Sequence, residues 1–270
     1  MARLRISFAL IVILAASSLA AQNDPTTNPQ LFDRYLVPVF TNAVHGSFGS
    51  EFYSSLSLWN KSDTQPLRVW GLQEVCVLSA CPPPPDFLDV PAPTIEAPLL
   101  QPNGNPGRFV FVEKAQSNRL AANLRVYDAS RDATNFGTEL PVVRQSDFAE
   151  RIVLPGVPMT PRFRNVLRIY SAVATDVTIS FGGPDVIGSP TITPPPQQTI
   201  TLREGENVFD PAYASFANFP SYPYPLTIVV DSVSGCPVCL SPPVPPAPIW
   251  AFVSVTNNET QHITTITPQP

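Results

Sequence analysis

Hydrophobic and polar residues alternate with a period of two along most of this chain, and one such pattern occurs twice. The two copies share an aromatic residue, two aliphatic residues and a second aromatic residue at identical spacing: Phe52, Leu56, Leu58 and Trp59, then Phe163, Leu167, Ile169 and Tyr170. A period of two places alternate side chains on opposite faces of a β-strand. The pattern therefore predicts a repeated strand, with Trp59 on the face opposite Leu56 and Leu58.

The surroundings of the two copies also match. Each is preceded by a hydrophobic segment with a proline, YLVPVF around Pro38 and RIVLPG around Pro155, and each is followed by a polar turn and another alternating segment. Self-similarity of this kind indicates duplicated structural units. We expect two related domains, at residues 33–145 and 151–268, joined by the short connector RQSDFAE.

Period-two segments continue through both units, about seven in each, separated by clusters of Gly, Pro, Asn and Asp. They include GTELPVV in the first unit and residues 163–171, 226–233 and 249–257 in the second. Helical periodicity is nearly absent, and the 34 prolines of the chain fall mainly between these segments. One exception is DPAYASFANFP, where Asp210 can cap a helix and Pro211 suits its first turn. The pattern predicts an all-β protein made of two tandem antiparallel β-sandwiches, with one short helix in the second.

This succession of strands resembles the tandem immunoglobulin-like β-sandwiches of exported bacterial proteins. The closing segment IWAFVSVTNNETQHITTITP is similar to the ends of uncharacterised secreted proteins of that type. The resemblance covers most of residues 33–268 and implies a fold rather than a chemistry, because this sandwich serves adhesion, binding and spacing alike. The Cys, Trp, Cys arrangement of antibody domains is missing.

The first 21 residues have the pattern of a signal peptide. Arg3 and Arg5 precede the apolar stretch 6–16, which is too short to span a bilayer, and Ser18-Leu19-Ala20 supplies the small residues of a cleavage site. We expect a secreted protein, extracellular or periplasmic, with no membrane insertion after cleavage; an uncleaved anchor is the alternative. The formal net charge of -5 and the lack of Lys or Arg runs argue against nucleic acid.

The four cysteines form two close pairs, Cys76 with Cys81 and Cys236 with Cys239. In an exported protein an even number of cysteines at short spacing favours disulfides, so we expect one local bridge in each pair among the three connectivities that four cysteines allow. The spacing of Cys236 and Cys239 also matches a thioredoxin-type redox motif, but the adjacent prolines disfavour the helix that such a motif needs. A zinc site would require both pairs to meet.

An acidic segment has the spacing of a calcium-binding loop. Its oxygen-bearing side chains occupy positions 1, 3, 5, 7 and 12 of such a loop: Asp128, Ser130, Asp132, Thr134 and Glu139. Ala133 stands where the sharp turn needs glycine, and the segment joins two expected strands rather than two helices. The alternative is a polar hairpin loop without a metal.

The sequence offers no catalytic constellation and implies no cofactor. Its two histidines, His45 and His262, fall in different expected domains, and no nucleophile elbow, phosphate loop or dinucleotide fingerprint is present. Exposed aromatic side chains, with Trp59, Tyr222 and Tyr224 as candidates, suit the stacking of sugar rings. We expect a non-enzymatic protein that acts through surface contacts with an unknown protein or cell-surface glycan; a carbohydrate-binding module, possibly with calcium, is the alternative.

Overall fold

The computed structural model describes residues 24–39, 44–45, 49–72, 87–93, 95–96, 107–134, 136–183, 197–209, 224–233 and 246–268. These residues form antiparallel strands and a few short 3-10 turns, and no helix among them is long and apolar enough to cross a membrane. The all-β class predicted from the period-two patterning is therefore confirmed. The segment around Asp210, the expected short helix, lies outside the described residues.

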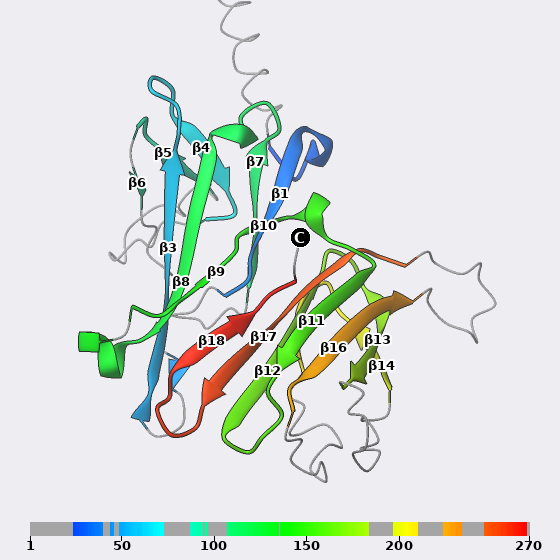
Figure 1. Ribbon diagram of the computed structural model, residues 1–270. Coiled ribbons are helices and arrows are strands. Elements are labelled where there is room, and N and C mark those ends of the chain that lie inside the picture. The colour runs from blue at the N-terminus through cyan, green and yellow to red at the C-terminus, as the bar shows by residue number, and fades with distance from the viewer. Residues whose placement is uncertain are drawn as a thin grey trace, which may run out of the picture. The chain divides into compact units, whose positions relative to one another are not determined.

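The strands divide into a first and a second group along the chain (Figure 1). The first group has ten: β1 (Phe32–Val37), β2 (Val44–His45), β3 (Glu51–Asn60), β4 (Leu67–Trp70), β5 (Phe87–Val90), β6 (Ile95–Glu96), β7 (Arg108–Glu113), β8 (Leu120–Asp128), β9 (Thr138–Leu140) and β10 (Val143–Arg144). The second has eight: β11 (Arg151–Val157), β12 (Phe163–Ser171), β13 (Thr175–Gly182), β14 (Gln198–Leu202), β15 (Gly205–Phe209), β16 (Leu226–Val233), β17 (Ile249–Asn257) and β18 (Ile263–Ile266). The 3-10 turns are η1 (Pro29–Leu31), η3 (Ser117–Arg119), η4 (Ala129–Thr134) and η5 (Gln145–Asp147).

The duplication seen in the sequence is repeated in the order of the strands. In the first group, β1, β7, β4 and β5 are neighbours in one sheet, and β3 lies between β6 and β8, with β9 beyond β8. In the second group the order is β11, β16, β13, β14 in one sheet and β15, β12, β17, β18 in the other. Each strand of the second group thus has a counterpart with the same neighbours, and β2 and β10 are additions to the first.

The two sheets of the second group pack face to face around one core. That core contains buried aliphatic side chains from both sheets, including Leu154 of β11, Ile179 of β13, Leu167 and Ile169 of β12 and Val253 of β17. Inward side chains alternate along β12 and β16, as expected when one face of a strand meets the opposite sheet. The second group is therefore a two-layer β-sandwich.

The strand order of this sandwich differs from that of a constant-type immunoglobulin domain. Such a domain has its first, second, fifth and fourth strands in one sheet and its third, sixth and seventh in the other. Here the first strand, β11, pairs with the sixth, β16, and the seventh, β17, pairs with the second, β12. Relative to that arrangement, the first, fourth and seventh strands (β11, β14 and β17) have changed sheets, and an eighth strand, β18, is added beside β17.

β11 is an edge strand with a bend near its end. Its pairing with β16 shifts register between Leu154 and Val157, where Pro155 and Gly156 intervene and Gly156 has φ +77°. Proline has no amide hydrogen to donate and glycine tolerates a positive φ, so both suit an interrupted edge. The bend leaves Pro155 exposed.

The chain forms two compact units, each built from separate segments. One consists of Met1–Tyr35, Ser57–Leu99 and Val110–Ala122, and the other of Leu36–Leu56, Leu100–Phe109 and Asn123–Pro270. β1, β3, β7 and β8 each begin in one unit and end in the other. The predicted division into domains at residues 33–145 and 151–268 stays a prediction.

Within the second unit, an aromatic cluster lies on the face of β12 and β17 that is turned away from the sandwich core. Tyr170, Trp250 and Phe252 are all buried there, with ring centroids 5.5–6.3 Å apart. The Tyr170 hydroxyl donates a hydrogen bond to the carbonyl oxygen of Pro38. A Cβ atom on Gly107 would lie 2.7 Å from the Tyr170 ring and 2.9 Å from that same oxygen. Segments around Pro38 and Gly107 thus cover Tyr170.

Candidate interaction surface

The first unit carries a row of three aromatic side chains across three neighbouring strands. β7, β4 and β5 are adjacent in one sheet, and Trp70 of β4 lies directly opposite Phe111 of β7 and Phe87 of β5. Residues directly opposite in an antiparallel sheet project on the same face. All three are partly exposed, whereas their neighbours along the strands, Val69 and Leu88, are buried on the other face. We call Phe111, Trp70 and Phe87 the aromatic row.

Arg68 lies against one end of the aromatic row. Its guanidinium carbon is 3.8 Å from the centre of the Phe87 ring and 5.9 Å from that of Trp70, which are cation–π distances. Asp89, opposite Arg68 on β5, accepts two hydrogen bonds from it, at 2.7 and 2.8 Å. These hydrogen bonds raise the pKa of the Arg68 guanidinium, although desolvation opposes the shift. Arg68 is therefore charged and held in one orientation.

A second arginine lies at the other end of the row, where the guanidinium carbon of Arg34 in β1 is 5.6 Å from the ring centre of Phe111. Glu113 of β7 is close enough to Arg68 to contribute to its raised pKa. The surface thus combines aromatic rings with two arginines and two carboxylates, so its charges nearly balance. Such a surface can bury apolar area in a partner while its edges form hydrogen bonds.

The sequence's candidate sugar-stacking residues are not members of this row. Trp59 is on the face of β3 opposite Leu56 and Leu58, as predicted, and its side chain is 47% exposed while both leucines are buried. Tyr224, just before β16, is 43% exposed. Tyr222 lies outside the described residues. Phe87 and Phe111 were not identified as candidates from the sequence. Their alternation with valine and leucine could have indicated that they lie on the outer face of their strands.

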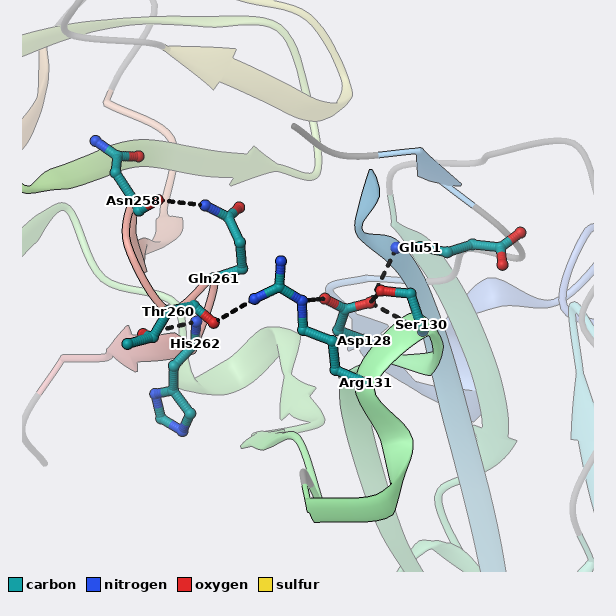
Figure 2. A network of polar contacts seen from close by, with 8 residues as sticks. All are labelled: Glu51, Asp128, Ser130, Arg131, Asn258, Thr260, Gln261 and His262. Carbon is teal, nitrogen blue, oxygen red and sulfur yellow. Dashed lines mark hydrogen bonds and ion pairs between the residues drawn. The ribbon is translucent and has the colours of Figure 1, made fainter. Parts of the chain in front are cut away.

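Asp128, the first residue of the candidate calcium loop, is buried and heavily bonded (Figure 2). Its Oδ1 accepts hydrogen bonds from the amide of Glu51 at 2.9 Å, the amide of Ser130 at 3.1 Å and the hydroxyl of Ser130 at 2.7 Å. Its Oδ2 has no hydrogen bond but is 3.7 Å from Nε of Arg131. A guanidinium therefore supplies the positive charge beside this carboxylate.

Glu139, the last residue of that loop, lies on the other face of the sheet. It is opposite Arg125 in the β8–β9 pairing, is 3.7 Å from the Arg125 guanidinium, and accepts a hydrogen bond of 2.7 Å from Asn123. Successive side chains of β8 point to opposite faces of the sheet. Arg125 and Asp128 are three positions apart, so they lie on opposite faces, and Glu139 lies on the face of Arg125. Asp128 and Ser130 come together, whereas Glu139 is separated from them; the Asp132 side chain lies outside the described residues.

The environment of Asp128 changes its acidity. Burial alone would raise the pKa of this carboxyl, but the hydrogen bonds from Ser130 and from the Glu51 amide outweigh burial, so the pKa lies below its ordinary value. The carboxylate is thus ionised at neutral pH. Among the described residues no group of three or more His, Cys, Asp or Glu side chains could hold a metal ion.

Arg131 links this carboxylate to the turn between β17 and β18 (Figure 2). Its Nη1 donates a hydrogen bond of 2.7 Å to the carbonyl oxygen of Thr260. In the same turn Gln261 has a positive φ of 58°, uncommon for a residue other than glycine, and its side chain donates to the Asn258 carbonyl oxygen at 2.7 Å. Arg131 therefore holds two turns of the second unit together, which is a structural role.

The remaining sequence candidates are the four cysteines and the two histidines. Cys76, Cys81, Cys236 and Cys239 lie outside the described residues, so both disulfides stay predictions. His45 in β2 and His262 before β18 are exposed. His262 contributes its backbone amide, which donates to the Thr260 hydroxyl at 3.3 Å. Comparison of the chain with models of protein families, with curated proteins and with solved structures finds no match.

Proposed function

We propose that this protein is an exported, non-catalytic binding protein built from two tandem β-sandwiches, immunoglobulin-like in having two packed antiparallel sheets although the second differs in strand order. The repeated strand in the sequence and the equal strand neighbours of the two groups support the tandem arrangement. The signal-peptide pattern of residues 1–21 supports export. The observation that carries the binding role is the aromatic row with Arg68 stacked on it.

The geometry of the row favours a protein partner. The rings of Trp70 and Phe87 meet at 61°, with their centres 4.9 Å apart, so they do not form one flat platform. Arg68 already covers a face of Phe87. A sugar ring needs a free flat face, whereas the residues that dominate protein interfaces are Trp, Tyr and Arg held in fixed orientations.

A carbohydrate partner is the second candidate, and the exposure of Trp59 and Tyr224 favours it. Each presents a free aromatic side chain of the kind on which sugars stack. An array of glycans and polysaccharides, probed with the exported chain with and without calcium, tests this candidate. Saturable binding that is lost in Trp59→Ala or Tyr224→Ala would replace the protein-partner proposal.

The test of the principal proposal is capture of a cell-surface or exported protein by the immobilised exported chain. We expect Trp70→Ala and Arg68→Ala to weaken capture at least tenfold, since interface residues of this type contribute more than about 1 kcal/mol each. Arg151→Ala is the matched control, because Arg151 also pairs with a carboxylate on the neighbouring strand, Asp231 at 3.0 Å, but outside the aromatic row. Equal capture by all three variants would contradict the proposal.

A further inference from the structure

Tyr170 and Trp59 occupy the same position of the repeated strand, but only one of them is covered. Ile169 lies opposite Asn207 and Tyr170 opposite Glu206, just as Leu58 lies opposite Glu96 and Trp59 opposite Ile95. The pairing register therefore agrees with the sequence repeat. Tyr170 is nevertheless fully buried, whereas Trp59 is 47% exposed.

Tyr170 is in contact with Pro38, which follows the end of β1. Pro38 is buried and its carbonyl oxygen accepts the hydrogen bond from Tyr170, and Leu36, two residues earlier, is buried as well. The Gly107 position, just before β7, allows the close approach because a side chain there would meet both the ring and the carbonyl oxygen. This contact lies entirely within the second unit.

The counterpart of that cover in the second repeat is exposed. When the two repeats are aligned so that Pro155 corresponds to Pro38, Leu154 corresponds to Val37, and both residues are buried. The same alignment places Val153 on Leu36. Val153 is 42% exposed and Pro155 is also exposed, whereas Leu36 and Pro38 are not. Val153 and Pro155, like Trp59, are therefore exposed where their counterparts in the other repeat are buried.

We infer that copies of this protein associate head to tail, with the Val153–Pro155 segment of one copy covering Trp59 of the next. Within one chain this kind of contact is made once, between the Pro38 segment and Tyr170. The corresponding residues of the other repeat, Trp59 and the segment around Val153, are both exposed and could make a second such contact between two copies. Different surfaces meet in this contact, so the association is heterologous and can continue from copy to copy. This inference goes beyond the proposed function and does not depend on it.

The experiment is sedimentation equilibrium and light scattering of the chain without the expected signal peptide, residues 1–21, over a range of concentrations. We expect the average mass of the wild-type protein to rise with concentration above that of one chain. Trp59→Glu and Val153→Glu should each remain monomeric, because each places a charge in one half of the contact. Phe136→Glu, at a side chain 89% exposed and remote in sequence from both halves, is the control and should associate like the wild type.

Mixing the two variants distinguishes head-to-tail association from a symmetric dimer. Trp59→Glu keeps an intact Val153 segment and Val153→Glu keeps an intact Trp59, so an equimolar mixture should form dimers and nothing larger. Circular dichroism checks that each variant is folded. A wild-type chain that stays monomeric up to millimolar concentration would overturn the inference. So would association that survives either substitution, or a mixture of the two variants that stays monomeric.

Discussion

Asp128 accepts a hydrogen bond from the amide of Glu51, 77 residues earlier, and so ties the end of β8 to the start of β3. Replacing Asp128 with Ala leaves the part-buried Glu51 and Ser130 amides without their acceptor. We expect this variant to lose about 2–4 kcal/mol of unfolding free energy, measured by urea denaturation. Asp128→Asn keeps an oxygen but points an amide at Arg131, and should lose about 1 kcal/mol. Equal stability of all three proteins would contradict this role.

The same carboxylate makes stability depend on pH. Its pKa is lowered in the folded protein because the hydrogen bonds outweigh burial, so its contribution is fully present above the unfolded value of about 3.8. That contribution is lost as the pH falls through the lower folded pKa. We therefore expect the free energy of unfolding to fall more steeply below about pH 4 in the wild type than in Asp128→Asn. Parallel pH profiles would contradict the prediction.

Asn60 stabilises the turn between β3 and β4 from a fully buried position. Its amide donates to the carbonyl oxygens of Gln65 at 2.8 Å and Val90 at 3.0 Å, and its oxygen accepts from the Ser62 amide at 3.0 Å. Asn60→Ala should cost about 2–3 kcal/mol, since three backbone groups lose their partners and the hydrogen bond to the Val90 carbonyl is buried. Denaturant titration measures this loss, and Lys61→Ala, at the exposed neighbouring position, should change stability by less than about 0.5 kcal/mol.

Burial of Asn60 also bears on its sequence context, because residues 60–62 match the pattern for glycosylation of asparagine. A glycan needs an exposed amide, and this one is fully buried. The folded chain incubated with a glycosylating extract should therefore carry no sugar at Asn60, as read by peptide mass spectrometry. Modification of Asn60 in the folded protein would show that the turn opens.

The contact over Tyr170 should tolerate little change. Gly107→Ala places a methyl group 2.7 Å from the Tyr170 ring, and Gly107 also has a positive φ of 154°, so we expect a loss of at least about 2 kcal/mol. Tyr170→Phe removes only the hydrogen bond to Pro38 and should cost about 1 kcal/mol. Thermal unfolding compares the two variants. Trp59→Phe, at the corresponding exposed position, should change stability little in dilute solution.

The strands were predicted well from the sequence wherever one face of a strand is buried. The predicted segments 163–171, 226–233 and 249–257 have the bounds of β12, β16 and β17, because the inward aliphatic residues fix both the period and the ends. β2, β5 and β15 were missed, and β2 has only two residues. β5 has only four residues between proline-rich stretches, and GENVF of β15 alternates too briefly to show a period. Pro141 divides the expected strand GTELPVV into β9 and β10.

The candidate sites were harder to predict, because they depend on which strands become neighbours. The face of β3 on which Trp59 lies follows from its phase relative to Leu56 and Leu58, but its exposure does not, because Tyr170 has the same phase in β12 and is fully buried. The aromatic row does not follow from any one segment, since Phe111, Trp70 and Phe87 meet only through the order β7, β4, β5. Likewise, the calcium-like spacing of Asp128 and Glu139 in the sequence does not predict that they lie on opposite faces of the sheet.

The pairing of β12 with β17 determines when the second sandwich can fold. Phe163 lies opposite Asn257 and Ser171 opposite Ile249, so the central strands of this sheet are far apart along the chain. The core contains Leu167 of β12 and Val253 of β17, so it is incomplete without β17. Folding of this half is therefore dominated by long-range contacts, which form slowly. The growing chain stays without this core until β17 has been synthesised.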